Sequence, residues 1–464
     1  MTFILQYILA IIIIFYETQR KRSQIIDILL IFNIVYFICY VVAPISAYFM
    51  LQDIIKENLS FDTYSVLFFV TGGEYDFSSS NFYMTGVLSI LAFLLLIFTY
   101  SSIRVKTSVA FFDSIFSKHV SYSKVYKLAL FLLSLSLIAL AYSIYAKGFS
   151  TWFFSNARMH FGGSEEAEAL DGDSWLVGKM LLFAQVAALL FWGLSRKEYK
   201  GVKVMISNPR FIVYVLFIIA LVLALLLVYR SSGRLTFFRF IAIFFVAGLY
   251  LSKGKRIPKA SLIQGLVIFL LGIFIVLYGR SFFRLFLYQE HAISVITEQQ
   301  NSFRESYFSF INNFTFPFFS VSNNLNYLGK EYLLFEDLFK SPLTLVPPRL
   351  LDLDMNSTSD VNTLRALGGL GHTIPPDILS YGLMNGGYLG VILAVVSFGI
   401  ILRLINSYAD KLVNPVAVAL FVFLAFNLGF RVMYFDPIHF LRGTFPFIFA
   451  IILYSMLPYR FKWK

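Results

Sequence analysis

Arginine residues gather at the ends of apolar segments of this chain, and arginine is well suited to binding phosphate. Arg230 and Arg234 follow one apolar segment, and Arg280 and Arg284 follow another with the same spacing of four residues. Residues four apart lie on one face of a helix, so each pair can point in one direction. A guanidinium group holds a phosphate through two parallel hydrogen bonds. The spacing therefore predicts a phosphate or diphosphate site at these ends.

Further arginines lie in the same kind of position. A third apolar segment ends at Arg431, Arg442 precedes the last one, and Arg239 lies near the start of another. Cations near hydrocarbon are costly unless they find an anion. Acidic residues of the long loops, a lipid headgroup and a bound diphosphate are the three alternatives. The acidic candidates are Glu290, Asp352 and Asp354. We favour the diphosphate, because the arginines recur at similar depth and few acids lie nearby. The predicted diphosphate-binding residues are Arg230, Arg234, Arg280, Arg284, Arg431 and Arg442.

Two histidines are candidates for a general base. His372 follows Gly369 and Gly371, and these small residues would let a substrate approach closely. A neutral histidine can take the proton of an attacking hydroxyl group. A loop histidine that is satisfied by backbone groups is the more frequent situation. His439, which stands near Asp436, competes for the same role.

Small polar side chains surround these histidines. Residues 346–390 are rich in hydroxyls, amides and carboxylates, and their prolines and glycines indicate a loop that leads into an apolar segment. Such groups suit hydrogen bonding to sugars. Asp360 and Asp377 are further possible bases. The predicted substrate-binding residues are Gly369, Gly371, Asp377, Tyr381 and His439.

The composition indicates a membrane protein. Of 464 residues, 58% are hydrophobic, 19% aromatic and only 14% charged, and the mean hydropathy is +0.75. An average soluble domain has about a quarter charged residues. These values exclude a soluble globular enzyme, a disordered protein and a nucleic-acid binder. The single cysteine, Cys39, excludes a disulfide framework and a thiolate metal site.

A membrane helix needs about 20 mostly apolar residues. Runs of this kind predict an all-α polytopic protein with eleven or twelve transmembrane helices in a single membrane domain, residues 1–464. The predicted spans are 2–17, 25–50, 83–100, 128–146, 175–195, 211–229, 235–251, 261–279, 385–405, 415–430 and 444–458. The long outer loops are predicted at 51–82, 147–174 and 280–384.

Basic clusters fall in every second loop, which predicts the orientation. They include Arg20 to Arg22, Arg196 to Arg210 and Lys253 to Lys259. The positive-inside rule makes these segments cytoplasmic, with the N-terminus outside and the C-terminus inside. Lysine is the commoner cation in the predicted cytoplasmic segments, whereas arginine outnumbers lysine in the rest of the chain. The outer half is therefore enriched in the side chain that recognises phosphate.

Several of these features resemble one family. The Ser232-Gly233-Arg234 turn between two central helices and the large outer loop are two of them. The others are the stretch His372-Thr-Ile-Pro-Pro, then Tyr381-Gly and Gly386-Gly-Tyr-Leu-Gly entering a helix. In this plan the chain resembles the bacterial O-antigen polymerases of the Wzy type, an oligosaccharide repeat unit polymerase family related in plan to the O-antigen ligases.

The resemblance implies a glycosyltransferase of the GT-C architecture in the bacterial inner membrane, with its site on the periplasmic face. The substrates would be glycans on undecaprenyl diphosphate, within membrane lipids. It implies that Arg234, Arg280 and Arg431 grip the diphosphate, and that the loop of His372 presents the acceptor, with His372 as the base. The catalytic residues would be His372, Arg234 and Arg280. A Wzz-type chain-length regulator and a Wzx-type flippase are the implied protein partners.

The implied reaction needs no cofactor and no metal. A hydroxyl of the acceptor repeat unit attacks the anomeric carbon of the donor glycan, and undecaprenyl diphosphate leaves. Fixed arginines would stabilise the charge that develops on the leaving group, as a divalent ion does elsewhere. Asp352 and Asp354 come nearest to a metal-binding pair, and they leave a metal-dependent variant open.

Other functions compete. A lipid-linked oligosaccharide flippase would also hold a lipid diphosphate, but it predicts charged residues through the mid-membrane and two related halves. Neither is seen in the sequence. An O-antigen ligase, or a polymerase of capsule or common antigen, would share the architecture and differ in the acceptor. A purely structural scaffold would not need the outer arginines.

Overall fold

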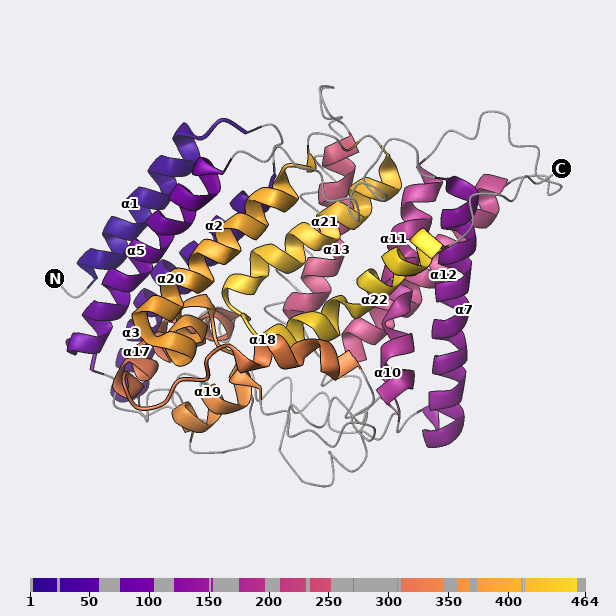
Figure 1. Ribbon diagram of the computed structural model, residues 1–464. Coiled ribbons are helices and arrows are strands. Elements are labelled where there is room, and N and C mark those ends of the chain that lie inside the picture. Colours follow the sequence, from indigo (N-terminus) through magenta and orange to yellow (C-terminus); the bar gives the residue numbers. More distant parts are fainter. Residues whose placement is uncertain are drawn as a thin grey trace. The chain divides into compact units, whose positions relative to one another are not determined.

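The computed structural model covers all 464 residues, and the part of the chain that it describes consists of helices, turns and loops (Figure 1). That part contains no β-strand, which confirms the predicted all-helical class. The structure describes residues 3–22, 26–57, 76–103, 121–149, 152, 175–196, 209–230, 234–251, 270, 307, 310–345, 357–367, 374–409, 412 and 414–456.

Seven helices of the described residues are long and apolar enough to cross a membrane. They are Ile28–Gln52, Ser80–Ser102, Tyr122–Lys147, Val177–Ser195, Arg210–Val228, Ile378–Asn406 and Pro415–Val432. Three shorter apolar helices are Ile4–Gln19, Arg239–Leu251 and Gly443–Met456. All of these coincide with predicted spans, and the remaining predicted span, 261–279, lies outside the described residues. The protein is therefore a multi-pass helical membrane protein.

The chain divides into two compact units. Unit 1 comprises 1–106, 280–407 and 425–442, and unit 2 comprises 107–279, 408–424 and 443–464. The long helices α21 (Pro415–Gly429) and α22 (Pro437–Met456) contribute residues to both. The single membrane domain and its three outer loops stay predictions.

Unit 1 contains the helices that position the polar residues discussed below. They are α1 (Ile4–Gln19), α2 (Ile28–Phe37), η1 (Ile38–Val42), α3 (Ala43–Glu57), α5 (Ser80–Ser102), η3 (Asn312–Phe314), α17 (Phe316–Asn324), η4 (Leu325–Tyr327), α18 (Glu336–Lys340), η5 (Ser341–Leu345), α19 (Thr358–Leu367), α20 (Ile378–Asn406) and η8 (Phe430–Val432). α20 packs against α5, α2 and α17, and α17 also packs against α19 (Figure 1). The core between α2, α5 and α20 is aromatic, with Phe32, Phe93 and Phe398 fully buried.

Side-chain caps explain where the helices of unit 1 begin. The Asp27 carboxylate accepts from the backbone N–H of Leu30 (2.8 Å) at the start of α2. The Ser79 hydroxyl accepts from the N–H of Phe82 (3.2 Å) at the start of α5. Each such cap satisfies a backbone donor that the helix leaves unpaired, and losing one costs about 0.5–2 kcal/mol.

Helix α20 begins earlier than predicted and is broken. The sequence predicts a loop up to residue 385, but the backbone is helical from Ile378. The helix then breaks at Gly386 and Gly387, and Gly387 has a positive φ of 59°. The chain turns so sharply that a Cβ on Gly390 would lie 2.1 Å from the carbonyl oxygen of Gly382. The glycine motif therefore serves a helix break rather than a simple helix entry.

The loop predicted at 280–384 is partly helical. The sequence indicates an irregular loop at residues 346–377, but residues 358–367 form helix α19. Its start is a capping box, because the Asp360 carboxylate accepts from the N–H (2.8 Å) and the hydroxyl (2.7 Å) of Ser357, and Ser357 accepts in return from the N–H of Asp360 (3.2 Å). Asp360, a predicted possible base, is thus engaged in helix capping.

Unit 2 is a separate helical cluster. Its elements are α7 (Tyr122–Lys147), α10 (Trp175–Leu181), α11 (Phe183–Ser195), α12 (Pro209–Arg230) and α13 (Arg234–Leu251), besides parts of α21 and α22. α11 packs against α7 and α12, and α12 packs against α13 (Figure 1). Residues of α11 are buried on every side, whereas α12 exposes Phe211, Tyr214 and Val222. An apolar helix with an exposed apolar face is suited to contact lipid.

Candidate functional site

Three buried carboxylates lie in unit 1, on segments that meet around the start of α20. The exposed fractions of Asp337, Asp377 and Asp436 are 5%, 0% and 1%. Burying a carboxylate is costly unless hydrogen bonds replace its water. The N–H of Phe435 donates to the carbonyl of Pro376 (2.8 Å), which ties the segment before α22 to the segment before α20.

Asp377 caps α20. Its carboxylate accepts from the backbone N–H groups of Leu379 (3.0 Å) and Ser380 (3.1 Å) and from the hydroxyl of Tyr40. Burial raises the pKa of Asp377 to about 6 although these hydrogen bonds act to lower it. All three partners and the carboxylate itself are buried, so Asp377, predicted to bind substrate, has a structural role in this arrangement.

Asp337 holds Tyr381 and α19. Its carboxylate accepts from the hydroxyl of Tyr381 (2.9 Å) and from the hydroxyl of Thr358. Burial raises the pKa of Asp337, and the charge of Asp436 acts in the same direction. The Tyr381 ring lies between Phe335 and Phe435, with centroid distances of 5.8 and 5.1 Å. Tyr381, also predicted to bind substrate, is 2% exposed and occupied by this contact.

Asp436 forms the one pair of this cluster that reaches the surface. It precedes Pro437 at the first position of α22, and its carboxylate accepts from the backbone N–H of His439 (3.0 Å). Its second oxygen is 3.0 Å from Nδ1 of His439 and also accepts from the hydroxyl of Ser359. The sequence Asp-Pro-Ile-His therefore folds as a helix cap that also holds the imidazole.

The electrostatics of this pair suit a base. Burial raises the pKa of Asp436, but the hydrogen bond and charge of His439 and the hydrogen bond of Ser359 outweigh it and hold the pKa at about 2. The Asp436 side chain is fully buried, whereas the side chain of His439 is 50% exposed. With Nδ1 held by an ionised carboxylate, Nε2 is the ring nitrogen left for a substrate. This is the arrangement of a carboxylate-oriented general base.

Arg431 lies on the same short segment. It belongs to η8, and its Nη1 donates to the carbonyl of Tyr434 (3.1 Å). Its guanidinium carbon lies 4.8 Å from the ring centroid of Phe440, the residue after His439. Stacking on an aromatic ring fixes the plane of a guanidinium group. Residues 431–440 thus carry both a predicted diphosphate-binding residue, Arg431, and a predicted general base, His439.

The other predicted arginines are only partly placed. Arg230 ends α12 and Arg234 begins α13, so this pair belongs to two different helices, and their side chains lie outside what the structure describes. The backbone of Arg442 is in α22, and its side chain is likewise not described. Arg280 and Arg284 lie outside the described residues. The arginine cluster as a whole stays a prediction.

The loop that contains His372, the first candidate base, also lies outside the described residues. Gly369, Gly371 and His372 belong to residues 368–373, which the structure does not describe. Within the described part of the chain no group of three or more His, Cys, Asp or Glu residues could hold a metal ion, and Asp352 and Asp354 lie outside that part. The metal-dependent alternative therefore rests on the sequence alone.

Sequence reasoning missed the partners of the carboxylates. Thr358 and Ser359, on the first turn of α19, donate to Asp337 and Asp436 respectively, and so connect the two acids. Tyr40 lies in an apolar run of the sequence. A hydroxyl in such a run needs a hydrogen-bond partner, and this was the signal that could have indicated its contact. Asp337 follows a short loop and carries no sequence pattern that marks it.

A second polar network supports α19. Asn324 donates to the amide oxygen of Asn362 (2.8 Å), and Asn362 donates to the hydroxyl of Ser320 (3.1 Å) and the carbonyl of Ile374 (3.0 Å). Arg365 donates to the amide oxygen of Asn324 (3.0 Å). Ser320 and Asn324 are four apart on α17, so one helix face presents both groups to α19. These bonds fix the helix that carries Ser359.

Comparison of the chain with protein-family models, with curated proteins and with solved structures finds no match.

Proposed function

We propose that this protein is a membrane glycosyltransferase that polymerises oligosaccharide repeat units carried on undecaprenyl diphosphate, as in the Wzy-type O-antigen polymerases. In this proposal it has eleven or twelve transmembrane helices in a GT-C-like architecture in the bacterial inner membrane, with its site on the periplasmic face. The observation that carries the proposal is the half-exposed His439, held by buried Asp436 on the segment that also bears Arg431.

The reaction that this geometry supports is a displacement at the anomeric carbon. The acceptor hydroxyl forms a new bond to the anomeric carbon of the donor glycan, and its proton passes to Nε2 of His439. The bond between that carbon and the bridging oxygen of the diphosphate breaks, and undecaprenyl diphosphate leaves with the electron pair. Asp436 stabilises the imidazolium that forms. A base in this position contributes a factor of about 10² to 10⁴.

Arginines supply the second part of the proposal. Negative charge develops on the leaving diphosphate, and fixed guanidinium groups lower the energy of that charge. Arg431 is the member of the predicted set whose contacts are described, and Arg234 and Arg280 are proposed to act with it. We expect Arg234→Ala and Arg280→Ala to abolish polymer formation in cells while the variants are still expressed.

His439 and His372 are rival bases within the same proposal. His439 has a carboxylate partner and a half-exposed side chain in the structure. His372 has the sequence resemblance in its favour. Their alanine variants distinguish them, because only the true base should lower the rate of polymer formation by two orders of magnitude or more.

The test is direct. Purified protein is incubated with lipid-linked repeat units, and the products are separated by size, with and without a chelator. A ladder of polymers that is unchanged by the chelator supports the proposal. If no ladder forms but the lipid-linked units cross the bilayer of a proteoliposome, the protein is a flippase. If no ladder forms but single repeat units are transferred from the carrier lipid to a lipid A–core acceptor, it is a ligase.

A further inference from the structure

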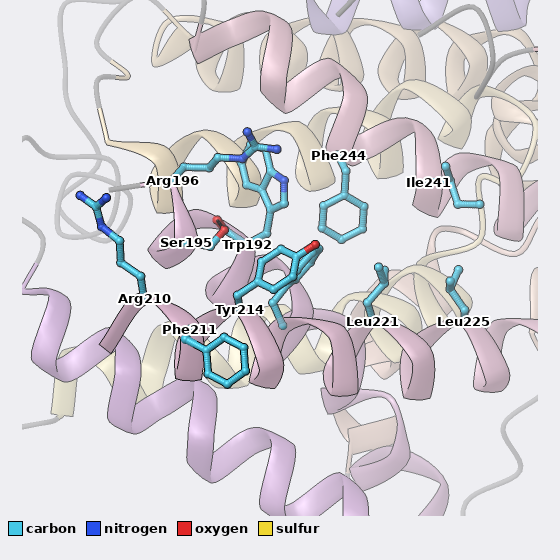
Figure 2. Close-up of a pocket in the computed structure, with 11 residues that line it drawn as sticks. Trp192, Ser195, Arg196, Arg210, Phe211, Tyr214, Leu221, Leu225, Ile241 and Phe244 are labelled. Atoms are coloured by element: carbon cyan, nitrogen blue, oxygen red, sulfur yellow. Dashed lines mark hydrogen bonds between the residues drawn. The ribbon is translucent and has the colours of Figure 1, made fainter. Parts of the chain in front are cut away.

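Unit 2 contains a groove that the proposed reaction does not use. Its volume is about 820 Å³, and residues of α11, α12 and α13 line it (Figure 2). Trp192 and Phe244 form its aromatic middle, and Leu221 and Ile241 lie toward one end. The walls are therefore apolar over most of the length, as in pockets that bind hydrocarbon.

The other end of the groove is cationic. Arg196 and Arg210 lie on the side opposite Leu221 and Ile241 (Figure 2). The guanidinium carbon of Arg196 lies 5.4 Å from the ring centroid of Trp192, and Arg210 is exposed. In the part of the chain that the structure describes, neither arginine forms an ion pair with an acidic side chain. This end of the groove therefore has the charge to hold an anionic group.

We propose that this groove binds an anionic phospholipid, with the phosphate between Arg196 and Arg210 and acyl chain along Leu221 and Ile241. The helix Arg210–Val228 is strongly apolar and most of its apolar window is not buried, so its outer face is suited to meet the hydrocarbon of the bilayer. A molecule with a hydrocarbon chain and a negative headgroup matches both ends of the groove. Basic pockets between transmembrane helices bind anionic headgroups in this way.

The sequence supports the same occupant. Arg196 and Arg210 lie in a basic cluster that the positive-inside rule predicts to be cytoplasmic, and their depth is therefore that of the headgroups of the inner leaflet. Charge complementarity favours a lipid with net negative charge over a zwitterionic lipid, because the described residues give these two cations no acidic partner. The site is independent of the proposed reaction and would persist if that reaction were a different one.

The first test measures the bound lipid. The protein is purified in mild detergent from bilayers of equal parts phosphatidylglycerol and phosphatidylcholine, and the retained lipids are counted by mass spectrometry. We expect the double variant Arg196→Gln, Arg210→Gln to retain about fivefold less phosphatidylglycerol or less still, with phosphatidylcholine unchanged. Lys21→Gln, which removes an exposed cation from unit 1, is the matched control and should change nothing. Equal retention by the double variant and the wild type would overturn the proposal.

A second measurement uses the unaltered protein, so it does not depend on the folding of a variant. Trp192 lines the groove, and its fluorescence is quenched by lipids brominated on the acyl chain. We expect brominated phosphatidylglycerol at low mole fraction to quench more strongly than brominated phosphatidylcholine, and Trp192→Phe to remove the difference. Equal quenching by the two lipids would show ordinary bilayer contact and reject a specific site.

Discussion

Asp377 and Asp436 perform the same structural task in unit 1 and differ in their second partner. Each carboxylate caps the start of a long helix by accepting backbone N–H groups of the first turn. The second partner of Asp377 is Tyr40, which is fully buried, and that of Asp436 is His439, whose side chain is half exposed. A capping carboxylate is therefore no sign of a site by itself. What marks a possible site is that the second partner of the carboxylate is exposed at the surface.

The two carboxylates also differ in electrostatics. Burial raises the pKa of Asp377 to about 6, and among the described residues no positive partner offsets the loss of water. Burial acts in the same direction on Asp436, but the hydrogen bond and charge of His439 outweigh it and hold the pKa at about 2. The environment thus keeps Asp436 ionised at neutral pH, which a carboxylate that stabilises an imidazolium requires.

The largest expected effect is a difference in rate between the two caps when each is replaced by asparagine. Asparagine is also a good cap, so both helices should form. In Asp436→Asn the amide cannot stabilise the imidazolium or fix its tautomer, and we expect the initial rate of polymer formation to fall by about 10² to 10⁴. Asp377→Asn is the matched control and should keep a rate close to that of the wild type.

Two outcomes would contradict this difference between the caps. Asp436→Asn could polymerise at the normal rate, in which case the pair is only a cap. Alternatively, Asp377→Asn could lose as much activity as Asp436→Asn in protein of equal folded content, in which case both carboxylates act through the structure.

Arg431 should give the next largest effect. We expect Arg431→Ala to lower the initial rate by about 10² to 10³, as the loss of one charge-stabilising group does in other enzymes. Arg431→Lys should recover only part of the rate, because a lysine cannot make the bidentate contact or stack on Phe440. Lys330→Ala removes an exposed cation from the same unit and should be silent. Full activity of Arg431→Ala would remove the arginine from the site.

Tyr381→Phe tests the enclosed part of the cluster. The change leaves the buried carboxylate of Asp337 without one of its donors, which should cost about 1–3 kcal/mol of unfolding free energy and lower the Tm. The rate per folded molecule should stay near normal, because this tyrosine is enclosed. Tyr388→Phe changes an exposed ring on the same helix and is the control. If Tyr381→Phe keeps its Tm and loses its rate, the tyrosine acts on substrate.

The smallest expected effect is on stability, whose pH dependence should have opposite signs for the two capping carboxylates. The pKa of Asp377 is raised from 3.8 to about 6 in the folded protein, so ionisation costs stability as pH rises through this range. The pKa of Asp436 is lowered to about 2, so its contribution is complete above about 3.8 and is lost as pH falls toward 2.

Thermal unfolding measures this directly. We expect the Tm of Asp377→Asn, relative to the wild type, to improve by a few degrees between pH 4 and pH 7. The relative Tm of Asp436→Asn should worsen between pH 2 and pH 4. The same slope for both variants would contradict the difference between the two caps.

The helices were predictable because they depend on long local patterns. Apolar runs alone placed the described spans to within a few residues, apart from the end of α3 and the starts of α7, α20 and α22. α20 starts at Ile378 because Asp377 caps it after two prolines, and α22 starts at Pro437 because Asp436 caps it. Both starts needed the capping rules rather than hydropathy.

The site was less predictable because it depends on contacts between distant segments. His439 and Asp436 are three residues apart, and the sequence already marked them as a possible pair. The contacts of Asp337 with Tyr381 and Thr358 join residues that are 44 and 21 positions apart, and no local pattern encodes them. Asp377 and Tyr381 have the residue types of a sugar site, but only burial shows that they are enclosed.

The most direct test of the central claim is the initial rate of polymer formation by purified His439→Ala, compared with wild type at equal folded content and with lipid-linked repeat units as substrate. If Nε2 of His439 is the general base, the rate of this variant is lower by about 10² to 10⁴, and added imidazole restores part of the lost rate. A rate close to that of wild type would contradict the assignment, and loss of the rate in His372→Ala alone would give the role to His372.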